Sequence, residues 1–296
     1  MREELKRIVG TFLPNLEFVD YKPIAGGFST EVFLIELRSE HDIKKLVLRT
    51  EGGQPAENSI KTEFDLLSIL HRRGIPCPKP LFLDTSCKTL DKRFMLMSYL
   101  KGEAEIPYSE NLSFIEEMAK KLRYIHETET DSLPNLSLRI NPLDNLFEYL
   151  PVTTNRDELI NFLRSIPDTE YKGTRMLLHG DFWPGNILWK NTEIVGIVDW
   201  EYAAIGDPFS DLAVTSLDLR YSLGVQGMKK LLEIYSNFLP IDRFRYSLWL
   251  IYVASSTLYF IDKWKLEKKM KSLMKKEAMA AIEEESYFLL NSCPTL

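Results

Sequence analysis

The chain has little cysteine, no long apolar run and no excess of basic charge, and each of these absences argues against one class of protein. Its 296 residues include three cysteines, Cys77, Cys87 and Cys293, with no Cys-x-x-Cys pair, so neither a disulfide framework nor a zinc site is predicted. No stretch approaches the roughly 18 consecutive apolar residues of a membrane-spanning helix, and the first ten residues carry charge where a leader would be apolar. We therefore expect a cytoplasmic protein with no membrane partner.

Basic residues are also fewer than acidic ones. The chain holds 37 Lys and Arg against 43 Asp and Glu, a formal net charge of −6, so the basic surface of a nucleic-acid-binding protein is missing and no nucleic-acid partner is predicted. Neither the P-loop pattern nor the dinucleotide pattern Gly-x-Gly-x-x-Gly occurs. Hydrophobic residues make up 45%, which is an ordinary globular composition, and the length allows one large domain or two joined lobes.

Hydrophobic periodicity changes along the chain. The first hundred residues predict strands with one helix: strands over 16–24, 31–37, 45–50, 80–83 and 93–99, and a helix over 57–70. The remainder predicts mainly helices, among them one opening at 113 and one over 157–163, interrupted by short strands at 176–178, 187–189 and 194–198. The helical part is also the more acidic one, which favours a bound molecule that carries positive charge.

One segment carries the chemistry. Asp181 and Asn186 have the Asp-x-x-x-x-Asn spacing of a kinase catalytic loop, in which the aspartate accepts the proton of the attacking hydroxyl and the asparagine binds magnesium. Asp199 follows the next predicted strand, where a carboxylate holds magnesium against the nucleotide phosphates. The spacing predicts phosphoryl transfer.

The stretches HGDFWPGNIL and IVDWEYAAIGDPFSDLA resemble the aminoglycoside phosphotransferase and choline kinase-like family. The resemblance implies a bilobal, protein-kinase-like α+β fold. Residues 1–98 would form a small antiparallel-sheet lobe with one helix, and residues 99–296 a larger, mainly helical lobe with the catalytic loop and the substrate cleft. The implied activity is ATP- and Mg²⁺-dependent phosphorylation of a small-molecule hydroxyl, with GTP still open as the donor.

Further residues fit a nucleotide site. Gly26 and Gly27 let backbone N–H groups approach phosphate, and Ser29 adds a hydroxyl donor. The family usually places a lysine on the third strand, paired with a helix glutamate; here the pair is Arg49 and Glu63, which otherwise would be a surface arginine and a solvated glutamate. The predicted nucleotide contacts are Gly26, Gly27, Phe28, Ser29, Val47, Arg49, Glu63 and the backbone of Ser98 and Leu100.

Three polar residues near the motif are predicted to be structural. His179 has no His or Cys nearby to share a metal, so we expect a buried, hydrogen-bonded histidine. Asp207 precedes Pro208 as a helix cap would, and Asp211 is placed to brace the catalytic loop from behind.

The acceptor is less defined by the sequence. An acidic helical lobe suits a cationic amine or amino alcohol, and the predicted contacts are Trp183, Glu201, Asp218 and Asp262. The lysine-rich stretch 263–276 is expected to be a solvated helix face. Choline, ethanolamine, an amino sugar, a macrolide and homoserine all remain open as acceptors, and so does the oligomeric state.

Two other functions compete with this prediction. A protein kinase is disfavoured because Asp199-Trp200-Glu201 replaces the usual DFG motif and no Ala-Pro-Glu motif follows. A non-catalytic nucleotide-binding regulator is disfavoured by the intact Asp181, Asn186 and Asp199, although the arginine at position 49 leaves it open.

Overall fold

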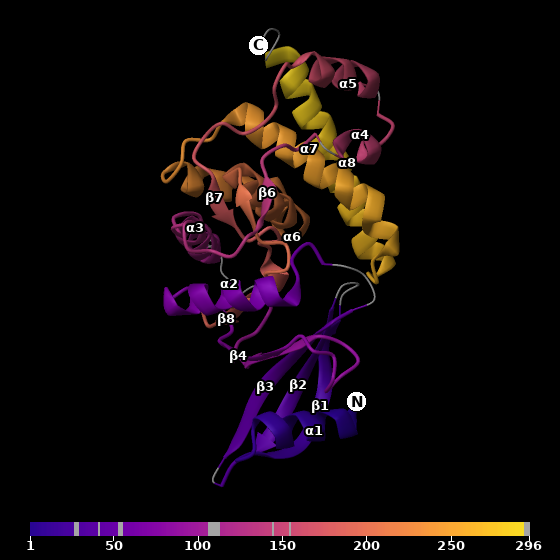
Figure 1. Ribbon diagram of the computed structural model, residues 1–296. Coiled ribbons are helices and arrows are strands. Elements are labelled where there is room, and N and C mark those ends of the chain that lie inside the picture. Colours follow the sequence, from indigo (N-terminus) through magenta and orange to yellow (C-terminus); the bar gives the residue numbers. More distant parts are fainter. Residues whose placement is uncertain are drawn as a thin grey trace. The chain divides into compact units, whose positions relative to one another are not determined.

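The computed structural model describes residues 1–26, 30–40, 42–52, 56–105, 113–143, 145–153 and 155–292 (Figure 1). The chain forms two compact units. The first unit comprises Met1–Glu105, Asp131–Ser137 and Asn186–Ala203, and the second comprises Ile106–Thr130, Leu138–Gly185 and Ala204–Leu296. The units thus differ from a simple division at residue 98, because two later segments pack with the N-terminal part.

The first unit is built on a five-stranded sheet in the order β1-β2-β3-β5-β4. Every neighbouring pair of these strands is antiparallel. The strands are β1 (Glu17–Gly26), β2 (Thr30–Arg38), β3 (Ile43–Glu51), β4 (Pro80–Asp84) and β5 (Phe94–Ser98). All five were predicted to within a few residues, because each is a β-branched or apolar run bounded by turn residues.

Two helices accompany this sheet, so the prediction of a single helix in the first hundred residues is wrong. The helix α1 (Arg2–Phe12) buries Leu5, Ile8 and Val9, which share one helix face at i, i+3 and i+4. They join a core with the sheet residues Ile35 and Leu48. The helix α2 (Ile60–Arg72) is the predicted one, and the Ser59 hydroxyl caps it by accepting a hydrogen bond from the Thr62 N–H.

A hairpin from later in the chain completes the first unit. It consists of β8 (Ile187–Lys190) and β9 (Glu193–Ile197), and the single-turn helix η1 (Pro184–Asn186) precedes it. The Ile197 N–H donates to the Pro76 carbonyl at 2.6 Å, and Trp189 exchanges backbone hydrogen bonds with Glu103. These bonds tie the hairpin to the segments that flank β4 and β5.

The second unit is mainly helical, as predicted. Its helices are α3 (Ser113–His126), α4 (Leu146–Tyr149), α5 (Arg156–Ser165), α6 (Pro208–Ser236), α7 (Arg243–Phe260) and α8 (Lys268–Ser292), with a short helix η2 (Ile261–Lys263) before α8. Three short strands, β6 (Ser137–Arg139), β10 (Ala204–Gly206) and β7 (Met176–Leu178), pair in that order. The helix α6 breaks at Gly224, whose φ of 72° is a conformation that favours glycine.

Among the residues that the structure describes, none of the helices combines the length and apolar character that crossing a bilayer requires.

Candidate active site

Arg49 is the centre of a buried ionic cluster in the first unit. Its Nε lies 3.1 Å from Glu63 Oε2, and its Nη2 lies 2.8 Å from both Asp199 Oδ1 and Glu201 Oε2. Arg49 is only 4% exposed, so the surface interpretation of this pair is excluded and the predicted pairing with Glu63 is present. We refer to Arg49, Glu63, Asp199 and Glu201 as the Arg49 cluster.

The Arg49 cluster contains more negative than positive charge. Burial raises the pKa of Glu63 to about 7; Arg49 opposes this shift, whereas Asp199 and Glu201 add to it. Burial by itself would lower the pKa of Arg49, but the three carboxylates raise it above its ordinary value, so the guanidinium stays charged. A single cation therefore faces three acids, which leaves the cluster able to accept further positive charge.

The turn that carries Asp199 and Glu201 is held by Asn58, a residue that no sequence pattern singles out. Asn58 is buried, and its Nδ2 donates to the carbonyls of Glu201 at 3.0 Å and Ala203 at 2.7 Å. Its backbone N–H donates to the same Glu201 carbonyl at 3.0 Å. Asp199 itself has a φ of 66°, an unusual value for a residue other than glycine, and the surrounding hydrogen bonds maintain it.

Asn186 and Asp199 lie at the same end of the β8–β9 hairpin. Ile187 pairs with Ile197, and the Val198 N–H donates to the Asn186 carbonyl at 2.9 Å, so the register brings the two predicted metal ligands to adjacent positions. The Asp199 side chain is 34% exposed and only its Oδ1 is engaged by Arg49. A carboxylate and an amide oxygen are ligands that suit Mg²⁺.

Within the described ranges, no group of three or more His, Cys, Asp or Glu side chains is arranged to hold a metal by itself. In proteins, Mg²⁺ is usually held by one or two carboxylates together with substrate phosphates and water. Asn186 and Asp199 thus fit an ion that arrives with a nucleotide.

The loop after β7, in the second unit, carries Asp181. The Asp211 carboxylate on α6 accepts the N–H groups of His179 at 2.7 Å and Gly180 at 2.8 Å. One turn further along α6, the Thr215 hydroxyl donates to the Phe182 carbonyl at 2.7 Å. The predicted brace by Asp211 is therefore present, and α6 holds the loop at both sides of Asp181.

A hydrogen-bonded chain supports Asp211 in turn. His126 Nε2 lies 3.3 Å from Asp211 Oδ2, and His126 Nδ1 lies 2.6 Å from the Tyr235 hydroxyl. Burial raises the pKa of Asp211, but the hydrogen bond and charge of His126 outweigh burial and leave it below the usual range. His179 is fully buried, as predicted, and its Nδ1 accepts the Asp181 N–H at 3.3 Å.

Two of the four predicted acceptor residues are close to Asp181. The Trp183 Nε1 donates to Asp181 Oδ2 at 3.2 Å, and the Trp183 side chain is partly exposed. Asp218 follows Thr215 on the loop-facing side of α6; its pKa is well above that of an ordinary aspartate because it is withdrawn from water and because the charge of Asp181 repels its own.

The other two predicted acceptor residues already have cationic partners. Glu201 belongs to the Arg49 cluster in the first unit. Asp262 is an exposed residue whose carboxylate oxygens accept from Lys275 Nζ at 2.7 and 2.8 Å. These pairings argue against a role for either carboxylate as the main contact of a cationic acceptor.

Asp207 has the predicted structural role. Its Oδ1 caps α6 by accepting the Phe209 N–H at 3.0 Å, and its Oδ2 accepts from Arg245 at 2.8 and 2.6 Å and from Trp249 Nε1 at 2.6 Å. Asp207 is fully buried, and burial raises its pKa although Arg245 and the donated hydrogen bonds oppose the shift.

The nucleotide contacts predicted in the first unit have different surroundings. Val47 is buried on β3. The Ser98 N–H donates to the Lys79 carbonyl at 2.9 Å, so this N–H is already used and the predicted adenine contact cannot rely on it. The Leu100 side chain packs on β9, where a Cβ at Gly196 would lie 2.7 Å from Leu100 Cδ1. Gly26 ends β1, whereas Gly27, Phe28 and Ser29 lie outside the described residues.

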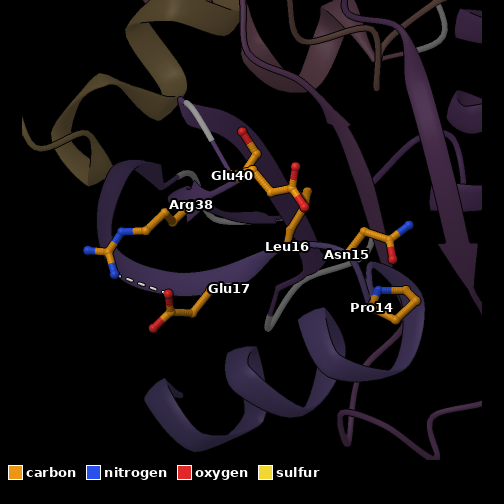
Figure 2. Close-up of a pocket in the computed structure, with 7 residues that line it drawn as sticks. Pro14, Asn15, Leu16, Glu17, Arg38 and Glu40 are labelled. Carbon is orange, nitrogen blue, oxygen red and sulfur yellow. Dashed lines mark hydrogen bonds and ion pairs between the residues drawn. The ribbon is translucent and has the colours of Figure 1, made fainter.

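A pocket on the first unit is separate from these residues. Figure 2 shows it, and its lining residues are Pro14, Asn15, Leu16, Glu17, Arg38, Ser39 and Glu40. Arg38 is at one end of β2, whereas Arg49 pairs with Val32 near the other end. Six residues of strand separate the two positions, about 20 Å at 3.3 Å per residue. The pocket is therefore not part of the candidate active site.

Comparison with curated proteins finds distant relatives. Acyl-CoA dehydrogenase family member 11 of Rattus norvegicus is 23% identical over 224 residues, covering 64% of this chain but only 28% of the relative. An aminoglycoside 3'-phosphotransferase of Streptomyces fradiae is 26% identical over 55% of this chain and 67% of the relative. A homoserine kinase of Methylobacillus flagellatus is 23% identical over 79% of this chain and 75% of the relative. The chain thus spans little more than a quarter of its dehydrogenase relative.

Solved structures confirm the predicted protein-kinase-like α+β fold. A candidate aminoglycoside phosphotransferase from Ralstonia eutropha matches 96% of this chain and 98% of its own, with a TM-score of 0.68 and 15% identity. The aminoglycoside phosphotransferase APH(4)-Ia, in a ternary complex with ADP and hygromycin B, matches 93% of this chain and 96% of its own, with a TM-score of 0.62 and 14% identity.

The family model for phosphotransferase enzymes matches residues 20–242, a range that contains the Arg49 cluster, the β8–β9 hairpin and the loop of Asp181. The chain therefore belongs to the phosphotransferase enzyme family.

Proposed function

We propose that the protein transfers the γ-phosphoryl group of ATP to a hydroxyl group of a small molecule, with Mg²⁺ as the metal. The observation that carries this proposal is the Arg49 cluster, in which one arginine and three acids surround the position predicted to bind metal and phosphate. An ion pair between a strand cation and a helix glutamate, beside a metal-binding aspartate, is a standard arrangement of kinase chemistry.

The residues of the first unit would act on the nucleotide. Arg49 would exchange part of its contact with Asp199 and Glu201 for phosphate oxygens, to which a guanidinium can bind bidentately. Asn186 and Asp199 would hold magnesium, which, when bound, neutralises charge on the phosphates. The ADP complex of the APH(4)-Ia neighbour supports an adenine nucleotide as the donor.

Asp181 would act on the acceptor. Its carboxylate orients the hydroxyl and takes the proton as the hydroxyl oxygen bonds to the γ-phosphorus. The bond from that phosphorus to the β,γ-bridging oxygen breaks, and ADP carries the electron pair away. The hydrogen bonds that the His179 and Gly180 N–H groups donate to Asp211, and the one that the Phe182 carbonyl accepts from Thr215, would help to position Asp181, on which this kind of catalysis depends.

Exchange of each aspartate for asparagine tests the two roles. Asp181→Asn removes the proton acceptor and leaves the metal ligands, so nucleotide binding should survive while turnover falls by about 10²- to 10⁴-fold. Asp199→Asn removes a carboxylate from a site for a hard cation, so both magnesium-dependent nucleotide affinity and turnover should fall. Calorimetric titration of ATP with and without Mg²⁺, together with a turnover assay, distinguishes the two results.

Asp157→Asn is a suitable control, because the Asp157 side chain is 94% exposed. If Asp181→Asn abolished nucleotide binding while Asp199→Asn kept normal turnover, the two roles would be wrong. Unchanged turnover in both variants would exclude the kinase function, and activity on a protein substrate in place of small molecules would favour the protein-kinase alternative.

We further propose a cationic amine or amino alcohol as the acceptor, on the evidence of Asp218. Asp218 is half-buried, its carboxylate lies in the field of Asp181, and it makes no ion pair among the described residues, so an ammonium group would give Asp218 a counter-ion. The KM of such an acceptor should rise with salt, because the Debye length falls from about 10 Å at 0.1 M to 3 Å at 1 M. A best acceptor that is neutral or anionic would contradict this proposal.

A hydroxyl group on an acyl-CoA is a second candidate acceptor. It is suggested by the dehydrogenase relative, whose name refers to acyl-CoA and which aligns with 64% of this chain. An assay of ADP formation with choline, ethanolamine, an aminoglycoside, homoserine and a hydroxyacyl-CoA, each in turn, decides between the two classes. The assay decides without any change of salt concentration, since only one of the two classes of acceptor should be phosphorylated efficiently.

A further inference from the structure

The lysine-rich segment 263–276 is the most strongly charged part of the second unit. It contains seven lysines and one acid, Glu267, so its formal charge is +6 in a chain whose total is −6. The segment runs from η2 into the first turns of α8, at one end of the α7–α8 pair (Figure 1). Such a concentration of one sign of charge plays no part in the proposed phosphoryl transfer.

Few of these charges are neutralised within the chain. Lys275 pairs with Asp262, and Lys271 Nζ donates to the Asp262 carbonyl at 3.2 Å. Lys265, Lys268 and Lys269 are exposed and have no ion pair or hydrogen bond within the described parts of the chain. At least three lysines are therefore available to an external anion.

Apolar side chains are exposed beside these lysines. Leu266 is 39% exposed, Met270 45% and Leu273 38%. Met270 and Leu273 share one side of α8; at 100° per residue Lys268 projects from the opposite side, whereas Lys269 lies beside Leu273. The fully buried residues of α8 begin only at Ala278, and the residues of its earlier turns are half-buried or exposed.

Exposed apolar side chains flanked by several lysines at one helix end are typical of segments that lie in a membrane interface. A merely solvated helix face does not need exposed Leu and Met, and the headgroup region of an anionic bilayer takes up apolar and cationic side chains together. We propose that the segment 263–276 docks peripherally on anionic lipid bilayers, with Leu266, Met270 and Leu273 entering the headgroup region and the free lysines binding anionic headgroups.

Co-sedimentation with vesicles tests the charges first. The full-length protein should bind vesicles of phosphatidylcholine mixed with phosphatidylserine, and bind phosphatidylcholine alone much more weakly. Each lysine near such a surface contributes about fivefold in affinity, so Lys265→Glu/Lys268→Glu/Lys269→Glu should lose on the order of a hundredfold or more.

A matched control changes the charge equally elsewhere. Lys120, Lys190 and Lys229 are exposed lysines outside the segment, and their joint replacement by Glu should lower vesicle affinity far less. Equal losses in the two triple variants would overturn the proposal, because they would show a response to net charge only. Thermal unfolding of each variant confirms that it is folded.

The apolar part is tested separately. Leu266→Ser/Met270→Ser/Leu273→Ser should lower the affinity for anionic vesicles at least tenfold while leaving all the lysines in place. Unchanged vesicle binding in this variant would overturn the proposal that Leu266, Met270 and Leu273 enter the headgroup region, because it would show that charge alone holds the protein on the vesicle. Failure of the wild-type protein to bind anionic vesicles at low salt would overturn it as well, whatever the outcome of the kinase assays.

Discussion

Asp207 in the second unit and the Arg49 cluster in the first unit contrast in how buried carboxylates are paired with positive charge. In the second unit, the oxygens of Asp207 accept hydrogen bonds from Arg245, Trp249 and the first turn of α6. We call Asp207 a matched acid, because its single negative charge has one cationic partner, Arg245. In the first unit, one guanidinium at Arg49 faces three acids, and Asp199 remains partly exposed. The comparison suggests that a matched acid fixes the fold, whereas a surplus of acid is kept for a bound cation.

The largest expected effect is the loss of a matched acid. Asp207→Ala leaves the Arg245 charge buried beside no carboxylate and removes the acceptor of Trp249 Nε1, so the free energy of unfolding should fall by about 3–5 kcal/mol. Urea denaturation followed by circular dichroism measures it, and the milder Asp207→Asn, which retains an oxygen acceptor, serves if the alanine variant does not fold.

Asp157→Ala is the control for this experiment, because its exposed side chain lies 3.7 Å from Arg156 and should contribute within about 0.5 kcal/mol. An Asp207→Ala protein as stable as this control would contradict the idea that matched acids fix the fold.

Loss of the single cation in the first unit should have the next largest effect. The sequence suggested that Arg49→Ala would weaken phosphate positioning more than folding, as at a surface strand position. Because Arg49 is buried, we now expect a loss of about 3 kcal/mol in unfolding free energy as well as weaker binding of Mg²⁺ and ATP. Arg49→Lys keeps the charge and should lose about 1 kcal/mol.

Denaturation and calorimetric ATP titration of both variants measure these effects. If Arg49→Ala kept the stability and the nucleotide affinity of the wild type, the three acids would not depend on Arg49. Arg49 would then have no role in the candidate site.

Removal of a surplus acid should have the smallest effect at neutral pH. The pKa of Glu63 is about 7 in the folded chain and 4.5 ordinarily. Between pH 4.5 and pH 7, the folded chain therefore keeps a proton on Glu63 that the unfolded chain has released. Glu63 therefore makes the wild type less stable as pH rises from about 4.5 to 7, by at most about 3 kcal/mol at 1.36 kcal/mol per pKa unit.

Glu63→Gln mimics the protonated form, so its stability relative to the wild type should improve between pH 5 and pH 8 and cost less than about 1 kcal/mol near pH 7. Unfolding free energies of both proteins at the two pH values test this. If the wild type instead gained stability relative to Glu63→Gln at pH 8, Glu63 would be a matched acid and the contrast between the units would fail.

Local sequence pattern predicted the elements that carry their own signals. The strands β1 to β5 were found because each is short, apolar and bounded by turn residues, and α2 because its apolar residues recur at helical spacing. The helix α1 has the same kind of signal in Leu5, Ile8 and Val9, but the charged residues between them obscured it. Asp207 and Asp211 were assigned correctly because capping and bracing depend on position near a helix start.

The spacing of Asp181, Asn186 and Asp199 was enough to predict the reaction class, since the loop and hairpin that position such groups in kinases are contiguous in the sequence. Burial at a distance was not predictable in the same way. Asn58 meets Glu201 across 143 residues and Arg49 meets Asp199 across 150, and no local periodicity records such contacts. Only the tertiary structure showed that Arg49 is buried among three acids, and that Lys265, Lys268 and Lys269 have no ion pair with any residue it describes, because charge pairing is decided by which distant segments pack together.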